Sequence, residues 1–257
     1  MQPGHLSQVQ FRCHDVRASA HFFASCFSWR INIAAENYAT IDTGAAPMGE
    51  LYQIPAPQVP IGVAPFVLVE DIAASFEKAV SLGGRPFIAP TPVPGGVFAN
   101  VIDPGGAEIS LLQSEDAPIE FAASGANPFI WLEKPAPDLA ASVGFYSGLF
   151  GWEFSQAPGV GDFAYHDTPD RAVGIGLVSG ARGAKLHGNT IYVRVHDAEA
   201  VCKVAAESGG AVITAEVNST LTRIRTLLSH TRSQVEDEHG HTVHTRSYTI
   251  SGRGACM

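Results

Sequence analysis

The chain has few charged residues and no long hydrophobic run, and both absences narrow what the protein can be. Only 16% of its residues are charged while 46% are hydrophobic, which is typical of a globular protein. No apolar run reaches the roughly 20 residues that a membrane-spanning helix needs. The first residues, MQPGHLSQ, also lack the basic and apolar regions of a signal peptide.

Cysteine is scarce as well. The four cysteines, Cys13, Cys26, Cys202 and Cys256, form no C-x-x-C pair. We therefore expect reduced, mostly packed thiols in a cytoplasmic protein. The sequence also lacks a phosphate-binding loop, a dinucleotide-binding fingerprint and a serine nucleophile elbow.

Basic residues are outnumbered, with 16 Lys and Arg against 25 Asp and Glu, so the net charge is −9. This charge argues against nucleic acid and anionic membranes as partners. We expect a small-molecule substrate or ligand instead, bound by a monomer or a homodimer. At 257 residues the chain is long enough for two domains, each with a sizeable core.

What the sequence does contain is an internal repeat. Residues 138–152, DLAASVGFYSGLFGW, align without a gap with residues 15–29, DVRASAHFFASCFSW. Each stretch begins with an aspartate suited to capping a helix, because its carboxylate accepts hydrogen bonds from the free N–H groups of the first turn. Apolar residues then recur at spacings of three and four, which predicts a helix with one apolar face. Ser28 and Gly151 are predicted to end the two helices.

A second repeat lies between and after these stretches. Residues 71–84, DIAASFEKAVSLGG, match residues 197–210, DAEAVCKVAAESGG. Both again predict an Asp-capped helix, and the Gly-Gly pair suits a left-handed C-terminal residue. Each predicted helix follows an apolar strand-like run. More strand-like segments follow, with turns at DPGG, residues 103–106, and DEHG, residues 237–240.

The chain thus divides into four similar modules, each a strand, a helix and about three further strands. Segments rich in helix and strand breakers join the modules. We predict an α+β fold with two tandem domains. Domain 1 spans residues 1–118, with modules at 1–57 and 58–118, and domain 2 spans residues 119–257, with modules at 125–182 and 186–250.

These motifs resemble the vicinal oxygen chelate superfamily, which includes glyoxalase I, bleomycin-resistance proteins and extradiol dioxygenases. The resemblance rests on D-x-x-x-S-x-x-F-Y-x-x-x-F-G-W at 138–152 and on the D-P-x-G turn at 103–106, and it covers almost the whole chain. It implies paired βαβββ modules whose curled mixed sheets enclose a cavity. Many members hold a divalent metal there, through one residue on the first strand and one on the last strand of each module. That metal acts as a Lewis acid on a chelating substrate.

The resemblance places the metal ligands of module one at Gln8, seven residues before Asp15, and at Glu50. In module four the corresponding positions are Thr190 and His244. If modules one and four share a cavity, Gln8, Glu50 and His244 would hold one Ni, Zn, Mn or Fe ion. His244 lies in the His-rich tract HGHTVHTRS, for which two interpretations stay open, a contribution to a metal site or a polar hairpin.

The other two modules supply poor ligands. The positions fall on Ala64 and Ser110 in module two, and on Trp131 and near Gly176 in module three. If the modules pair in sequence order, neither cavity has a full ligand set, and the protein would then be free of metal. Both pairings occur in the superfamily, and the sequence leaves the choice open.

Further residues are candidates for catalysis and substrate binding. Glu50 is the candidate general base. Arg12, on the first predicted strand, would receive an anionic substrate group, with Tyr52 as an inward-facing neighbour. Trp131 and Tyr192 would stack on a flat ligand, unless they simply fill the core. Arg194 completes the predicted substrate-binding set.

Two classes of function follow from the resemblance. The first is a glyoxalase-like enzyme that acts on a small molecule with isomerase or lyase chemistry, either around a partial metal site or, in secondary metabolism, without a metal. Dioxygenation is least expected, because the His, His, Glu set of those members is absent. The alternative is a metal-free binding protein of the bleomycin-resistance kind, which would hold a flat or cationic compound.

Overall fold

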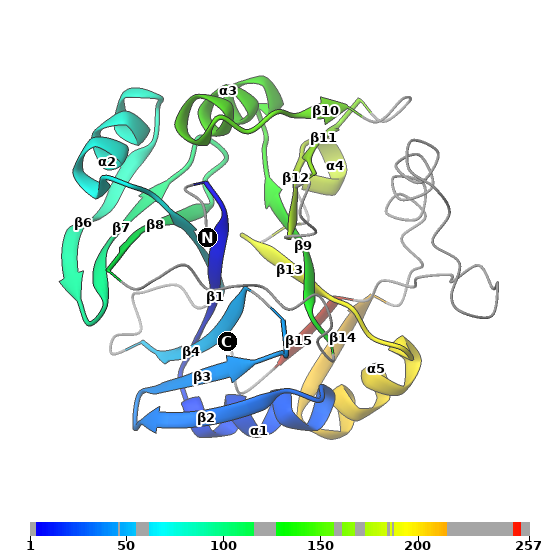
Figure 1. The fold of residues 1–257 in the computed structure, drawn as a ribbon. Helices are drawn as coiled ribbons and strands as arrows, with labels where there is room; N and C mark the ends of the chain where they lie inside the picture. Colours follow the sequence, from blue (N-terminus) through cyan, green and yellow to red (C-terminus); the bar gives the residue numbers. More distant parts are fainter. Residues whose placement is uncertain are drawn as a thin grey trace, which may run out of the picture.

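A computed structural model of the chain shows two mixed β-sheets, a small third sheet and four longer helices among the described residues (Figure 1). No helix in this part of the chain is both long and apolar enough to cross a membrane. The structure describes residues 4–45, 47–54, 62–115, 127–156, 161–167, 173–183, 186, 188–214 and 249–252.

The larger sheet has eight strands in the order β2-β3-β4-β1-β5-β8-β7-β6. Its two central strands, β1 and β5, run antiparallel, and each pairs on its other side with a parallel strand, β1 with β4 and β5 with β8. The two halves of the sheet therefore repeat one plan. The strands are β1 (Leu6–Cys13), β2 (Arg30–Ala35), β3 (Tyr38–Asp42), β4 (Met48–Gln53), β5 (Gly62–Leu68), β6 (Arg85–Val93), β7 (Gly96–Ile102) and β8 (Glu108–Ser114).

The second sheet has five strands in the order β10-β11-β12-β9-β13. Strand β9 pairs with β12 in parallel and with β13 antiparallel, as β1 does with β4 and β5. In both sheets the first strands of consecutive modules are thus neighbours, whereas β1 and β13 lie in different sheets. The strands are β9 (Phe129–Pro135), β10 (Ser155–Gln156), β11 (Phe163–His166), β12 (Gly174–Val178) and β13 (Thr190–Val193), and β14 (Gly210–Thr214) pairs separately with β15 (Thr249–Gly252).

The predicted aspartate caps are present at all four longer helices. In each, the capping carboxylate accepts from the backbone N–H three residues further on, at 2.9 to 3.0 Å. Gly151, at φ 73°, ends its helix in the left-handed conformation that glycine adopts readily. The helices are α1 (Val16–Cys26), α2 (Ile72–Ser81), α3 (Leu139–Phe150) and α5 (Ala198–Glu207), and a short α4 (Gly180–Gly183) follows β12.

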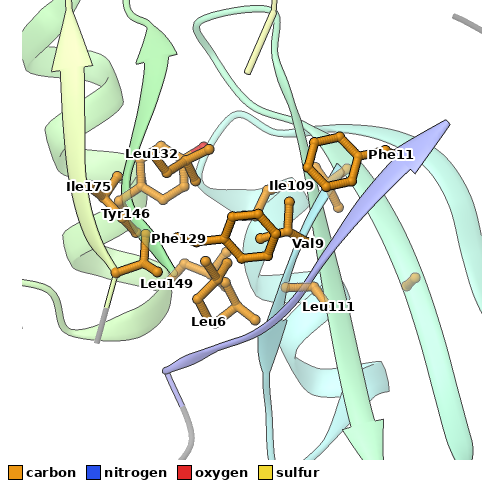
Figure 2. Close-up of a cluster of buried hydrophobic side chains, with 14 of the residues drawn as sticks. Leu6, Val9, Phe11, Ile109, Leu111, Phe129, Leu132, Tyr146, Leu149 and Ile175 are labelled. Atoms are coloured by element: carbon orange, nitrogen blue, oxygen red, sulfur yellow. The ribbon is translucent and has the colours of Figure 1, made fainter. Parts of the chain in front are cut away.

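The two large sheets share one hydrophobic core (Figure 2). Val9 and Phe11 point from β1 toward Phe129 and Leu132 of β9, and the rings of Phe11 and Phe129 lie 5.9 Å apart. Helices α1 and α5 also lie side by side, as do α2 and α3 (Figure 1). Most aromatic residues of the first repeat are in or against this core, whereas Phe22 packs in a smaller cluster with Cys26 and Ala205.

A buried ion pair also links the two sheets. Lys134, on β9, has its Nζ atom 3.4 Å from Oδ2 of Asp103, in the turn between β7 and β8. The same ammonium donates to the backbone oxygen of Glu108 at 2.8 Å and to the side-chain oxygen of Asn189 at 2.5 Å. Burial lowers the pKa of Lys134, which its nearness to Asp103 partly offsets. The Tyr146 hydroxyl donates to Asp103 as well.

Three cysteines, Cys13, Cys26 and Cys202, are buried and free of disulfides, as predicted. Burial, with a smaller contribution from nearby Cys202, raises the pKa of the Cys26 thiol to about 11. Such a thiol is almost fully protonated near neutral pH and is therefore unreactive. Cys256 lies outside the described residues.

Candidate active site on the eight-stranded sheet

Polar side chains gather on the face of the eight-stranded sheet that points away from its core. Along β1, Gln8, Gln10 and Arg12 alternate with the fully or largely buried Val9 and Phe11. Because side chains alternate between faces of a strand, the three polar residues share one face. Strand β4 adds further polar residues to that face, since its register sets Glu50 beside Gln10 and Tyr52 beside Arg12.

Glu50 lies among these residues with only 7% of its surface exposed. One carboxylate oxygen accepts from the hydroxyl of Tyr38, on β3, at 2.7 Å. The other accepts from the side-chain amide of Gln10 at 3.2 Å. Two donors from the two flanking strands therefore fix the orientation of this carboxylate.

Burial raises the pKa of Glu50, although the hydrogen bonds from Tyr38 and Gln10 lower it in part. The pKa of Tyr38 is raised too, by burial and by the neighbouring carboxylate. A carboxylate with a raised pKa accepts a proton more readily than an ordinary surface glutamate. This is the property that a general base for carbon acids needs near neutral pH.

Arg12 is engaged by a partner that the sequence did not predict. Its two terminal nitrogens donate to the two carboxylate oxygens of Glu108, on β8, each at 2.5 Å. The side chain of Asn100 donates to Glu108 as well, and Ser110 lies 3.5 Å from it. The charge of Arg12, predicted to receive an anion, is therefore already balanced inside the protein.

Glu108 was missed because the resemblance pointed to Ser110, two residues further along the same strand. Side chains alternate between the faces of a strand, so Glu108 and Ser110 lie on the same face. This spacing could have identified Glu108 from the sequence. The register confirms that Ser110 on β8 corresponds to Glu50 on β4. Ser110 pairs with Phe66 of β5, just as Glu50 pairs with Gln10 of β1.

The remaining candidates on the first sheet lie close to these residues. Gln8 is half-buried and pairs with Met48 and Phe66, so the direct neighbour of Glu50 in the register is Gln10. Tyr52 is half-buried and lies between Tyr38 and Arg12 in the register.

The candidates of the second sheet form a separate group. Trp131, on β9, is buried and pairs with Gly174 of β12 and Tyr192 of β13. Its indole covers Gly174, since a Cβ atom there would lie 2.4 Å from the ring. The Tyr192 hydroxyl donates to Glu133, two residues after Trp131, at 2.8 Å. Trp131 also stacks on Phe163, with ring centroids 6.3 Å apart.

Two predicted residues lie apart from both groups. Arg194 is exposed just beyond the end of β13. His244 lies outside the described residues, so the site of Gln8, Glu50 and His244 stays a prediction. Thr190, the other module-four position, is on β13 in the five-stranded sheet, whereas Gln8 and Glu50 are in the eight-stranded one.

The donor set of the described residues does not fit a four-ligand metal site. On the first sheet the superfamily positions hold Gln8, Glu50, Ala64 and Ser110, and Ala64 has no side-chain donor atom. Nowhere in the described ranges do three or more His, Cys, Asp and Glu side chains come together as a metal would require. Divalent metals are usually held by several such groups at once.

Comparisons with known proteins support the resemblance that the sequence motifs indicate. Residues 129–245 match the model of the Glyoxalase/Bleomycin resistance protein/Dioxygenase superfamily. Anthracycline biosynthesis protein DauV of Streptomyces sp. (strain C5) is 31% identical over a match that covers 32% of this chain and 36% of that protein. The match thus spans about a third of that relative's length.

Solved structures extend the likeness to most of the chain. The Mn(II)-bound glyoxalase from Novosphingobium aromaticivorans has a TM-score of 0.56 at 16% identity, covering 82% of this chain and 73% of its own. A variant of 4-hydroxymandelate synthase from Streptomyces coelicolor has a TM-score of 0.51 at 15% identity, covering 93% and 86%. At these identities the likeness concerns the fold alone. The resemblance to the vicinal oxygen chelate superfamily is therefore confirmed, by the family-model match over residues 129–245 and by the likeness in fold to these solved structures.

Proposed function

We propose that the protein is a glyoxalase-like enzyme in which Glu50 removes a proton from a carbon atom next to the carbonyl group of a small molecule. The observation that carries the proposal is the buried Glu50 carboxylate, which has a raised pKa and is oriented by Tyr38 and Gln10. Proton removal from such a carbon is the step shared by isomerases and many lyases. The polar face of the eight-stranded sheet would line the substrate cavity.

Each neighbour of Glu50 has a role in this chemistry. Tyr38 and Gln10 hold the carboxylate so that a proton can reach it along a fixed direction. The loss of a proton from carbon leaves negative charge on the carbonyl oxygen, which needs a hydrogen-bond donor. Arg12 has five N–H donors, of which Glu108 takes two, and it stands beside Gln10 on the same face. We assign it to the substrate oxygen.

In this mechanism, protein side chains supply both the general base and the hydrogen-bond donor. If a metal is held by Gln8, Glu50 and His244, it would polarise the same carbonyl oxygen as a Lewis acid. Elemental mass spectrometry of the untagged protein distinguishes the two cases. The metal-free route predicts well under one equivalent of Ni, Zn, Mn or Fe after add-back, whereas about one equivalent that is lost in Glu50→Ala would favour the metal site.

The proposed chemistry is tested by solvent exchange. A panel of 2-hydroxyketones is incubated with the protein in deuterium oxide, and proton NMR follows loss of the signal at the carbon next to the carbonyl group. One relative is named for anthracycline biosynthesis, which favours aromatic hydroxyketones in the panel. We expect exchange that Glu50→Gln lowers by about 10² to 10⁴-fold, the usual contribution of a positioned base.

Glu36→Gln is the matched control, because Glu36 is an exposed carboxylate in the turn before β3. Its exchange rate should equal that of the unmodified protein. If Glu50→Gln exchanges at the same rate as the unmodified protein, and circular dichroism shows that it is folded, the assignment of Glu50 as the base is refuted.

A second candidate function is a binding protein without turnover. The aromatic side chains over the five-stranded sheet, Trp131, Phe163 and Tyr165, favour it, since such surfaces hold flat compounds. It predicts a rise in melting temperature with a flat aromatic ligand and no product, because a ligand that binds only the folded state stabilises it.

A further inference from the structure

Arg12 and Glu108 meet across an entire strand of the eight-stranded sheet. Arg12 is on β1 and Glu108 is on β8, and β5 lies between these two strands. The residues of β5 that pair with Arg12 and Gln10 are Gly62 and Ala64. Both are small, so they leave room on this face of the sheet for the long Arg12 side chain to reach Glu108. The ion pair therefore belongs to the polar face that also carries Glu50.

The contact between the two side chains has the form in which an arginine binds a carboxylate. Two terminal nitrogens of Arg12 donate to the two oxygens of Glu108, each at 2.5 Å. Such two-fold contacts are the preferred way for a guanidinium to hold a carboxylate. The two side chains are only 8% and 13% exposed, so dissolved ions screen the pair little. Glu108 therefore occupies the position that a carboxylate of a substrate would take on Arg12.

Glu108 is held in this position by further hydrogen bonds. Its carboxylate also accepts from the side-chain amide of Asn100. Its backbone oxygen accepts from the Lys134 ammonium and from the Asn189 side chain, each at 2.8 Å. Asn189 donates as well to the backbone oxygen of Val63, on β5, at 2.9 Å. An anionic substrate would therefore compete for Arg12 with a carboxylate that is fixed at both its backbone and its side chain.

We propose that Glu108 sets the substrate class of the enzyme proposed above, and this assignment rests on that function. The site takes uncharged carbonyl compounds and rejects those that carry a carboxylate next to the carbonyl group. A neutral carbonyl oxygen needs one N–H donor, and Arg12 has five, of which Glu108 takes two. A substrate carboxylate would need the two that Glu108 holds. It would also be repelled by Glu108 and, whenever that group is ionised, by Glu50.

The test compares two compounds that differ by one group. Hydroxyacetone and hydroxypyruvate are both 2-hydroxyketones, and the first has a methyl group where the second has a carboxylate. Their dissociation constants for the unmodified protein are measured by ligand-observed NMR, a readout that needs no turnover. We expect the unmodified protein to bind hydroxyacetone at least about tenfold more tightly than hydroxypyruvate, the effect of one charge-assisted hydrogen bond that the carboxylate cannot gain.

Glu108→Gln should remove this preference. A glutamine side chain has one oxygen and one amide NH₂ group, so it leaves one terminal nitrogen and the charge of Arg12 to a ligand. The variant should bind hydroxypyruvate about tenfold more tightly than the unmodified protein does, and combination with Arg12→Gln should abolish this gain. Glu115→Gln is the matched control, because Glu115 is an exposed carboxylate just after β8 and its loss changes the net charge equally.

Two outcomes would overturn the assignment of Glu108. The first is equal or tighter binding of hydroxypyruvate by the unmodified protein, which decides the question even if Glu108→Gln does not fold. The second is a gain of hydroxypyruvate affinity in Glu115→Gln as large as in Glu108→Gln, or no gain in either. Proton exchange of hydroxyacetone in deuterium oxide separates these results from the proposed catalysis. The binding preference without exchange would support Glu108 and count against Glu50 as the base, whereas exchange without the preference would do the reverse.

Discussion

The hydroxyl of Tyr38 donates to the carboxylate of Glu50 at 2.7 Å, across the boundary between β3 and β4. Both groups have a raised pKa, and burial is the main cause for each. Glu50 is therefore a base that accepts a proton readily, and Tyr38 is a hydrogen-bond donor that keeps its own proton. Two predictions follow from this pair, one for stability and one for reactivity.

The first prediction concerns the pH dependence of stability. Because folding raises the pKa of Glu50, the folded state binds its proton more tightly than the unfolded state does. The stabilisation of the folded state by protonation of Glu50 is therefore fully present at pH values below the pKa of Glu50 in the unfolded chain. It is lost as the pH rises through the pKa of Glu50 in the folded protein. Urea unfolding of the unmodified protein and Glu50→Gln at pH 5 and pH 8 measures it. The variant should lose less stability between these two pH values, by less than about 1.4 kcal/mol for each unit of raised pKa, because pH 5 already lies above the unfolded pKa of a glutamate.

The second prediction concerns Tyr38→Phe. Without the hydroxyl donor the pKa of Glu50 should rise further, because that hydrogen bond favours the charged carboxylate. The pH at which proton exchange is half-maximal should then move upward. Tyr52→Phe is the control, since Tyr52 is half-buried two residues after Glu50 on β4 and therefore lies on the same face of the sheet. A shift of equal size in both variants would contradict a specific role of the Tyr38 hydroxyl.

The third prediction concerns the buried pair of Lys134 and Asp103. Lys134→Met should lower the free energy of unfolding by about 3 to 5 kcal/mol, because it leaves Asp103 buried without its cation. The double variant with Asp103→Asn should cost less than the sum of the two single variants. A double-mutant cycle from chemical unfolding measures this coupling. Additive losses would show that the two groups do not interact.

The fourth prediction compares two glycines. A Cβ atom at Gly174 would lie 2.4 Å from the Trp131 ring, so Gly174→Ala should lower stability by about 1 to 3 kcal/mol. At Gly144, inside α3, a Cβ atom would meet nothing within 4 Å. Gly144→Ala should therefore raise stability by about 0.5 to 1 kcal/mol. Thermal unfolding of both variants measures the contrast, and equal effects would contradict the packing of Trp131 over Gly174.

The sequence predicted the parts of the fold that depend on local chemistry. The aspartate caps at residues 15, 71, 138 and 197 are visible locally because an N-cap contacts residues only three positions away. Glu50 was found through its spacing within a familiar module, and its burial supports the interest in it. The domain boundaries at residues 118 and 119 stay predictions.

Contacts between residues on strands that are far apart in the chain could not be predicted from the sequence. Arg12 and Glu108 are 96 positions apart, and nothing local indicates that their side chains meet. The open choice of module pairing was of the same kind, since hydrogen bonds between β1 and β5 leave no local signature. Trp131 was expected to face a cavity, but a single sequence does not reveal that the glycines beneath it make room for its ring.

The fit between Trp131 and the glycines of β12 has a consequence for how this protein evolves. Exchange of the indole for a small ligating side chain would leave an empty space over Gly174 and Gly176, whereas a larger residue at either glycine would strike the ring while the tryptophan is present. Each single step is thus unfavourable, although the combined change need not be. A change from this packing to a ligating side chain on this face would therefore require at least two interdependent substitutions.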